Sequence, residues 1–128
     1  MNAAWGNPGK PEAAASILRP LAKDANALVL VHWALMRAER AAGKLDTALE
    51  QAHWLAGNRG RAFVENAGLG LVGNLNIAAN NEALLDGAEI AAENGDEVES
   101  RRQLQRFTAA WPTASLPPDM RRRVEKLQ

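Results

Sequence analysis

The chain has 128 residues, no cysteine, and equal numbers of acidic and basic side chains, so its formal net charge is zero. The absence of cysteine excludes disulfides, thiol catalysis and cysteine-based zinc sites, and the zero net charge argues against a general nucleic-acid binder. The longest apolar run, residues 27–36, is far shorter than the roughly 20 residues needed to cross a bilayer, so we expect a soluble, cytoplasmic protein with no membrane partner.

Helices are expected along almost the whole chain, because alanine and leucine are abundant while β-branched residues never alternate over a useful length. The first helix is predicted over residues 11–23, since a proline stands at its first position. A second helix is predicted over residues 27–42, with Asp24 or Asn26 as its cap and Gly43 as its C-terminal stop.

A third helix is predicted to end near Ala56, before a turn over residues 57–60. Asp46 or Thr47 can cap this helix, and Thr47-x-x-Glu50 has the form of a capping box. The first three helices are therefore expected to be separated by short turns.

The next segment, residues 61–81, is expected to be mostly helical, with a break near residues 68–70 as the alternative. Each of its three glycines weakens a helix by about 1 kcal/mol relative to alanine. These glycines are Gly68, Gly70 and Gly73. A separate helix is then predicted over residues 82–94, with Asn81 as its cap and Gly95 as its stop.

The C-terminal part of the chain predicts two more helices. Asp96-x-x-Glu99 opens the first of them, over residues 97–110, and Trp111-Pro112 closes it. Its side chains available for packing are Val98, Leu104 and Phe107. After a proline-rich link, residues 119–127 can form a short basic helix.

An internal repeat connects the first helices. Gly9 and Gly43 lie 34 residues apart, and each is followed by lysine and an alanine-rich segment. At the same offset Ala14 falls on Ala48, and a leucine at 21 falls on Leu55. A period of 34 residues is the tetratricopeptide spacing, in which helical hairpins stack on copies of themselves.

On these residues the chain resembles a divergent tetratricopeptide-repeat protein. In that family a glycine closes the first helix of each unit, a small residue follows five positions later, and a proline often ends the unit. One unit carries this order in Gly43, Ala48 and Leu55, and the last carries it in Gly95, Ser100, Leu104, Phe107 and Pro112.

The sequence also departs from the family pattern. The interval from Gly43 to Gly95 is 52 residues, so the last unit carries about half a repeat extra. His32, Met36 and Glu39 stand where the family's first helix has tryptophan, glycine and tyrosine. A non-repetitive helical bundle is therefore the alternative fold.

The resemblance implies an all-α single domain of antiparallel helical hairpins, stacked as a right-handed superhelix with a C-terminal capping helix. We expect a flexible start over residues 1–10, the best-matching repeats over 11–60, an irregular last unit over 61–112, and a proline-rich link with a basic capping helix over 113–128. The chain begins inside a unit, which makes it either the end of a longer array or a small protein whose N-terminal helix lacks a partner.

Candidate catalytic and metal-binding residues are weak. His32-Trp33 and His53-Trp54 repeat one dipeptide, but their spacing matches no metal site, and we expect half-buried histidines beside core tryptophans. The glycine pattern at 68, 70 and 73 has dinucleotide-fingerprint spacing but no preceding strand. No serine lies in a nucleophile elbow. We therefore expect no catalytic residue, no cofactor and no metal.

The charged residues form two blocks late in the chain. Acidic side chains without any lysine or arginine occupy residues 82–99, and basic ones follow at residues 101–106 and 121–126. We expect a solvated acidic helix face that is partly neutralised by its neighbour, and a surface or capping role for the arginines rather than phosphate binding.

The resemblance also indicates a partner-binding groove, because first helices line the concave surface in that family. Trp33, Arg37 and Arg40 share one helix face at i, i+4 and i+7, and tryptophan and arginine are enriched at binding hot spots. Arginine can also grip a carboxylate with two parallel hydrogen bonds. The alternative is a core Trp33 beside solvated arginines. The groove-facing positions are Leu30, Trp33, Arg37 and Arg40 in one unit and Glu82, Leu85 and Glu89 in the last.

The function expected from these features is a non-enzymatic scaffold that binds a protein or peptide partner. Two alternatives remain open at this point. One is a structural or oligomerisation module that self-associates through the unpaired face of its N-terminal helix. The other is a C-terminal helical accessory domain of a larger enzyme or regulator.

Overall fold

The structure, a computed structural model, describes residues 10–24, 27–58 and 71–128, with side chains described from residue 79 onward in the last of these ranges. The described residues contain six α-helices and one 3₁₀ turn, and no strand. These elements are α2 (Lys10–Ala22), α3 (Val29–Ala41), α4 (Leu45–Gly57), α6 (Leu71–Glu93), α7 (Glu97–Ala110), η1 (Thr113–Ser115) and α8 (Pro118–Leu127). The expected all-α class is confirmed.

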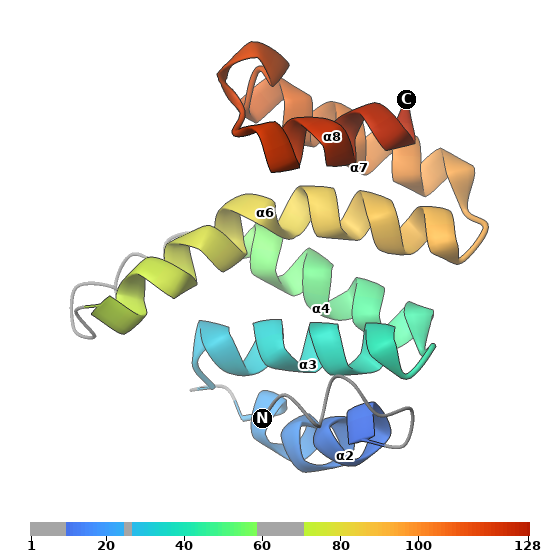
Figure 1. Cartoon of the computed structure of the whole chain (residues 1–128). Coiled ribbons are helices and arrows are strands. Elements are labelled where there is room, and N and C mark those ends of the chain that lie inside the picture. The colour runs from blue at the N-terminus through green and yellow to red at the C-terminus, as the bar shows by residue number, and fades with distance from the viewer. Residues whose placement is uncertain (1–9, 25–26, 59–70) are drawn as a thin grey trace.

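The helices pack side by side in chain order, with α2 and the α7–α8 pair at opposite ends of the stack (Figure 1). Helix α3 packs between α2 and α4, and α6 packs between α4 and α7. In addition α3 contacts α6, and α8 folds back onto both α6 and α7. As a result α3, α6 and α8 share one face of the molecule.

Two glycine turns of the same geometry close the hairpins α3–α4 and α6–α7. Gly43 has φ of +80° and Gly95 has φ of +78°, a backbone region in which glycine avoids the Cβ clash of other residues. The amide after each glycine donates back to the helix, from Lys44 N to Glu39 O at 2.8 Å and from Asp96 N to Ala91 O at 2.9 Å. Both predicted glycine stops are confirmed.

The small residue five positions after each glycine lies where the two helices of the hairpin cross. Ala48 is fully buried, and Ser100 is buried with its hydroxyl donating to Ala88 O at 2.8 Å. The Asp96 side chain accepts from Glu99 N at 3.1 Å, which confirms the predicted start of the helix at residue 97. These local signals position both hairpins.

Three buried apolar clusters hold the stack together. A small cluster centred on Ala15 and Leu35 joins α2 to α3. An alanine-rich cluster joins α3, α4 and α6, and a third cluster, which includes Phe107 and Val124, joins α6, α7 and α8. None of the helices in the described parts of the chain combines the length and apolar character that a bilayer crossing requires.

Several predicted helix starts are wrong. Helix α3 begins at Val29 after Leu28, with no side-chain cap, so Asp24 and Asn26 do not cap it. Helix α4 begins at Leu45, which leaves Asp46 and Thr47 inside the first turn, and the Thr47 hydroxyl donates to Lys44 O instead of forming a capping box. Lys10 belongs to α2 and not to a flexible start. Caps were misplaced because several polar residues stand near each start.

The predicted break at Asn81 is also wrong, since α6 runs without interruption from Leu71 to Glu93 and includes Gly73. The neighbouring Asn80 is buried and donates from Nδ2 to Leu55 O in the last turn of α4, at 2.5 Å. This bond satisfies an amide inside a helix that would otherwise favour a cap. The predictions for residues 61–70, including Gly68 and Gly70, lie outside the described residues.

Candidate functional site

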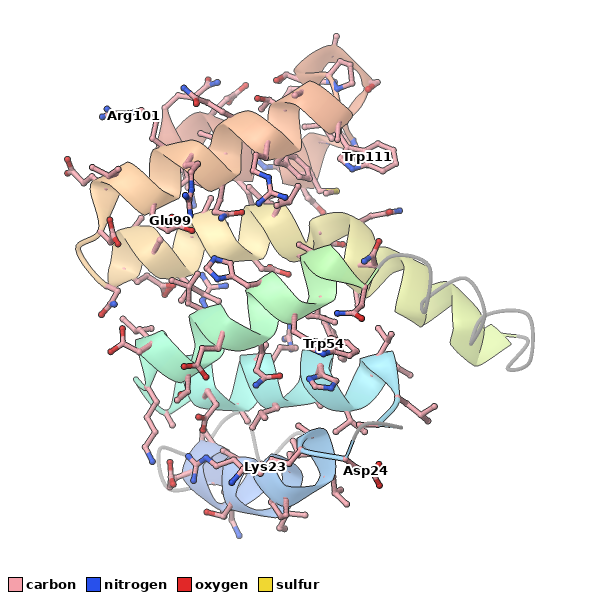
Figure 2. All side chains as sticks on the ribbon, turned by 180° about the vertical axis from the view of Figure 1, so that it is seen from behind. Lys23, Asp24, Trp54, Glu99, Arg101 and Trp111 are labelled. Carbon is pink, nitrogen blue, oxygen red and sulfur yellow. The ribbon has the colours of Figure 1, made fainter. Side chains whose placement is uncertain are left out.

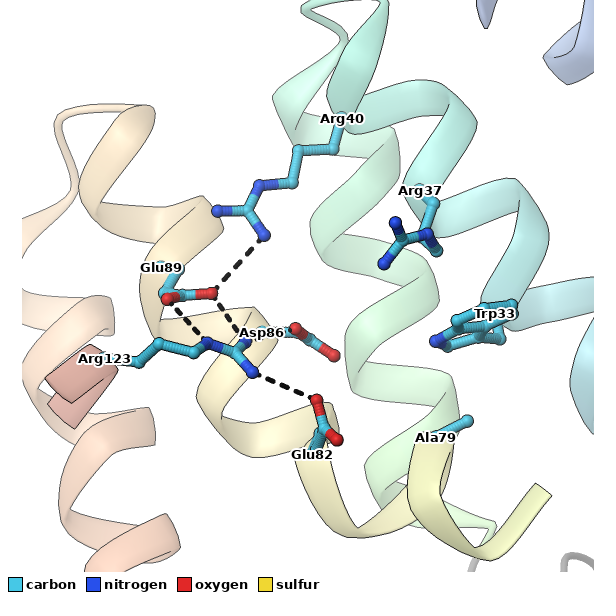
Figure 3. Close-up of a pocket in the computed structure, with 8 residues that line it drawn as sticks. All are labelled: Trp33, Arg37, Arg40, Ala79, Glu82, Asp86, Glu89 and Arg123. Carbon is cyan, nitrogen blue, oxygen red and sulfur yellow. Dashed lines mark hydrogen bonds and ion pairs between the residues drawn. The ribbon is translucent and has the colours of Figure 1, made fainter. Parts of the chain in front are cut away.

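A cavity of about 390 Å³ opens between α3, α6 and α8 (Figure 3). A second cavity of about 360 Å³ adjoins it and shares Arg37, Arg40 and Asp86 with it. Together we call these two cavities the groove. The residues lining the larger cavity are Trp33, Arg37, Arg40, Ala79, Glu82, Asp86, Glu89 and Arg123.

The structure brings together five of the six groove residues predicted from the sequence. Trp33, Arg37 and Arg40 line the cavity from α3, and Glu82 and Glu89 line it from α6. The sixth, Leu30, is half-buried on α3 and does not line either cavity of the groove. Leu85, at a matching position of the last unit, is fully buried in the apolar core instead.

Trp33 and Arg37 form the α3 wall of the groove. The Arg37 guanidinium carbon lies 5.0 Å from the centre of the Trp33 ring, which is the geometry of a cation–π contact. Trp33 is half-buried against the α3–α4–α6 cluster, while Arg37 is exposed. Thus the tryptophan presents part of its ring to the groove on a fixed support.

Arg40 is already paired across the groove. Its Nε donates to Glu93 Oε2 at 2.8 Å, and its Nη1 donates to Glu89 Oε1 at 3.4 Å. The positive charge of Arg40 therefore connects α3 to α6, and a partner's carboxylate would have to compete with two carboxylates of the chain for it.

Arg123 from α8 closes the other side of the groove in a cage of three α6 carboxylates (Figure 3). Its Nη2 donates to Asp86 Oδ1 at 2.8 Å and to Glu89 Oε1 at 2.7 Å. Its Nε donates to Glu89 Oε2 at 3.0 Å, and its Nη1 donates to Glu82 Oε2 at 3.0 Å. The bond with Glu89 is the main cause that raises the pKa of Arg123, so this guanidinium stays charged.

Asp86 is the most buried of these carboxylates. Burial raises its pKa to about 6, because the loss of water outweighs the attraction of Arg123. The negative charges of Glu82 and Glu89 raise the pKa further. Asp86 is therefore the group of the groove whose charge changes near neutral pH.

Sequence reasoning missed Asp86 and Arg123 as groove residues. A signal for Asp86 existed, since Glu82, Asp86 and Glu89 stand at i, i+4 and i+7 and must share one helix face. The expected neutralisation of an acidic face by a neighbour is found here, with Arg123 as the neighbour. Nothing local singles out Arg123 among the arginines of α8, because its partners lie 34 to 41 positions away.

The two histidines have different environments. His32 is buried, stacks on Trp54 with 3.5 Å between ring centres, and lies 2.6 Å from Gln51 Oε1. His53 is exposed, and its Nε2 lies 3.0 Å from Glu99 Oε1, so the expectation of a half-buried ring is wrong for His53. Trp54 and Glu99 are both visible from behind in Figure 2.

Glu99 is the centre of this second polar cluster, on the side of the molecule away from the groove. A hydrogen bond from Gln103 is the main cause that lowers the pKa of Glu99, and Arg102 and His53 add to it. No group of three or more histidine, aspartate or glutamate side chains in the described residues could hold a metal ion. The cluster therefore serves to join α4 to α7.

Comparisons of the chain with protein-family models, with curated proteins and with solved structures return no match.

Proposed function

We propose that this domain binds a protein or peptide partner in the groove between α3, α6 and α8, without catalysis. In this proposal the hairpins α3–α4 and α6–α7 are successive units of a tetratricopeptide-like right-handed superhelix in the cytoplasm, and α8 is its capping helix. The observation that carries it is the groove itself, in which residues from α3, α6 and α8 surround one cavity.

The chemistry of the groove supports recognition of a polypeptide. The half-buried Trp33 offers an apolar surface on a fixed support, and tryptophan with arginine is the combination most enriched at binding hot spots. Charges of both signs surround this surface, with Arg37 on one wall and Glu82 on the other. A groove of this kind matches one apolar anchor flanked by polar contacts.

The experiment is to select peptides from a random library on the full chain and to titrate them by fluorescence anisotropy. Replacement of Arg37 by glutamate is expected to weaken the selected peptides by about tenfold, or roughly 1.4 kcal/mol. Arg37→Glu is a cleaner variant than Arg40→Glu, because the latter would place a new carboxylate beside Glu89 and Glu93. Trp33→Ala is expected to weaken binding more, by about 2 kcal/mol.

The matched control is Arg101→Glu, which makes the same charge change at an exposed position of α7 outside the groove (Figure 2). It should leave the affinity of the selected peptides unchanged. Equal affinity for the wild type, Arg37→Glu and Trp33→Ala, all with unchanged helicity, would contradict the proposed site.

The second candidate, self-association through α2, is favoured by the exposed apolar face of that helix. Ile17 is 68% exposed and Leu21 is 51% exposed. At an offset of 34 residues these positions correspond to Gln51 and Leu55 of α4. Gln51 contacts His32 of α3, and Leu55 is buried in the cluster that α4 shares with α3, so the corresponding face of α4 is covered.

Light scattering over a range of protein concentrations tests this second candidate. If α2 mediates association, the mass should rise with concentration in the wild type and stay that of a monomer when Ile17 and Leu21 are both replaced by lysine. A monomeric wild type at all concentrations would exclude it.

A further inference from the structure

We propose that protonation of Asp86 makes the groove a better site for an anionic segment of the partner, so that binding of such a segment strengthens as the pH falls. This inference rests on the proposed function. It is carried by the position of Asp86, which lines both cavities of the groove and is only 7% exposed.

Three carboxylates on one face of α6 explain why one of them takes up a proton readily. Glu82, Asp86 and Glu89 converge on the single guanidinium of Arg123. Neighbouring like charges and burial both disfavour an ionised carboxylate. Asp86 lies in the middle of the three and is the most buried of them. Its pKa of about 6 agrees with this geometry.

The charged groups around Asp86 come from three helices. Those that line the cavities with it are Arg37 and Arg40 from α3, Glu82, Glu89 and Glu93 from α6, and Arg123 from α8. Among the described residues, α4 and α7 contribute no charged side chain to the lining of either cavity. The two histidines lie elsewhere, against Trp54 and Glu99.

Protonation of Asp86 changes the charge of the groove and leaves its architecture in place. Around the larger cavity three arginines balance three carboxylates while Asp86 is ionised, and one positive charge is in excess once it is neutral. Arg123 keeps its bonds to Glu82 and Glu89 through Nη1, Nε and Nη2. Helix α8 therefore stays in place while an anionic ligand gains about one unit of favourable charge.

The experiment uses two fluorescein-labelled probe peptides, one alternating leucine with glutamate and the other alternating leucine with lysine. Both are titrated with the full chain between about pH 7.5 and pH 5.5, on either side of the Asp86 pKa. The ratio of the affinity for the anionic probe to that for the cationic probe should rise by about fivefold over this range in the wild type.

In Asp86→Asn this ratio should be independent of pH and equal to the wild-type value at the acidic end, because asparagine has the shape of the protonated acid without its charge. The variant retains both histidines, so their titration cancels in the comparison. Asp119→Asn, which removes an exposed carboxylate from α8 outside the groove, is the control and should behave like the wild type.

Titration of the Asp86 carboxyl carbon by NMR gives a second measurement that does not depend on binding. A midpoint below about 4.5 would overturn the inference whatever the peptides do. The same pH dependence of the affinity ratio in the wild type and in Asp86→Asn would overturn the inference and leave the proposed function standing. Absence of binding by both probes at every pH would contradict the proposed function, and the inference with it.

Discussion

The hairpins α3–α4 and α6–α7 have the same backbone frame and different interiors. Each turns at a glycine with positive φ, and each crosses at a small buried residue five positions later. At the offset of 52 residues, however, Leu55 corresponds to the larger Phe107, Ala48 to Ser100, and the half-buried Ala34 to the buried Asp86. The frame is a local property, while the interior adapts to the helix that covers it.

The covering helices themselves are attached by a common device. At one end Arg19 of α2 pairs with the buried Glu39 of α3 at 2.5 Å, and at the other Arg123 of α8 pairs with the buried Asp86 of α6 at 2.8 Å. A buried carboxylate that loses its cation is strongly destabilised, so each pair fixes the position of a terminal helix. The second pair opens onto the groove and the first does not line it.

The largest expected effect concerns the bulky interior of the second hairpin. Phe107→Ala should lower the free energy of unfolding by about 3–5 kcal/mol, because Phe107 is fully buried between α6, α7 and α8. The control is Val98→Ala on the same helix, where the side chain is 78% exposed and does not pack as the sequence suggested. Urea denaturation measures both variants, and a similar loss in each would refute this account of the cluster.

The shared frame is tested at its glycines. Gly43→Ala should cost about 1–2 kcal/mol, because alanine is strained at a φ of +80° although no atom crowds the site. Gly95→Ala should cost the same amount, since its φ and its surroundings match. Gly57→Ala at the end of α4 has neither positive φ nor crowding and should cause no loss. Thermal denaturation of the three variants decides whether the two turns are equivalent.

The buried Asp86 should give the second hairpin a pH-dependent stability. An acid whose pKa is raised from 3.8 to about 6 binds its proton more tightly in the folded state, so stability is gained below that value and lost as the pH rises through it. We expect the wild type to lose about 1 kcal/mol between about pH 5 and pH 7 relative to Asp86→Asn. A constant difference between the two proteins over this range would show that Asp86 does not titrate there.

The smallest expected effect concerns the two crossing points. Ser100→Ala should cost about 1 kcal/mol, because it leaves the crossing without the hydrogen bond to Ala88 O. Ala48→Ser should stay within about 0.5 kcal/mol of the wild type, since Met36 O is the carbonyl that corresponds to Ala88 O. A large loss in Ala48→Ser would mean that the two crossings differ in geometry despite the common frame.

Much of this architecture follows from local sequence signals. The helix ends at Gly43, Gly95 and Trp111 are where the sequence predicts them, because glycine conformations and a following proline act within a few residues. The starts of α3 and α4 were predicted incorrectly, since several polar residues near each start could serve as a cap. The register carried from Gly43 to Gly95 was also sufficient to place five of the six predicted residues along the groove.

By itself, therefore, the sequence determined the helical class, most helix ends and the face of α3 that carries Trp33 and Arg37. Only the tertiary structure decided that α6 continues through Asn80 and Asn81, because the carbonyl that satisfies Asn80 belongs to Leu55 of α4. It also decided that Arg123 enters the groove and that Asp86 is buried there. Contacts between residues so far apart in the chain depend on how helices pack, and no local pattern encodes that packing.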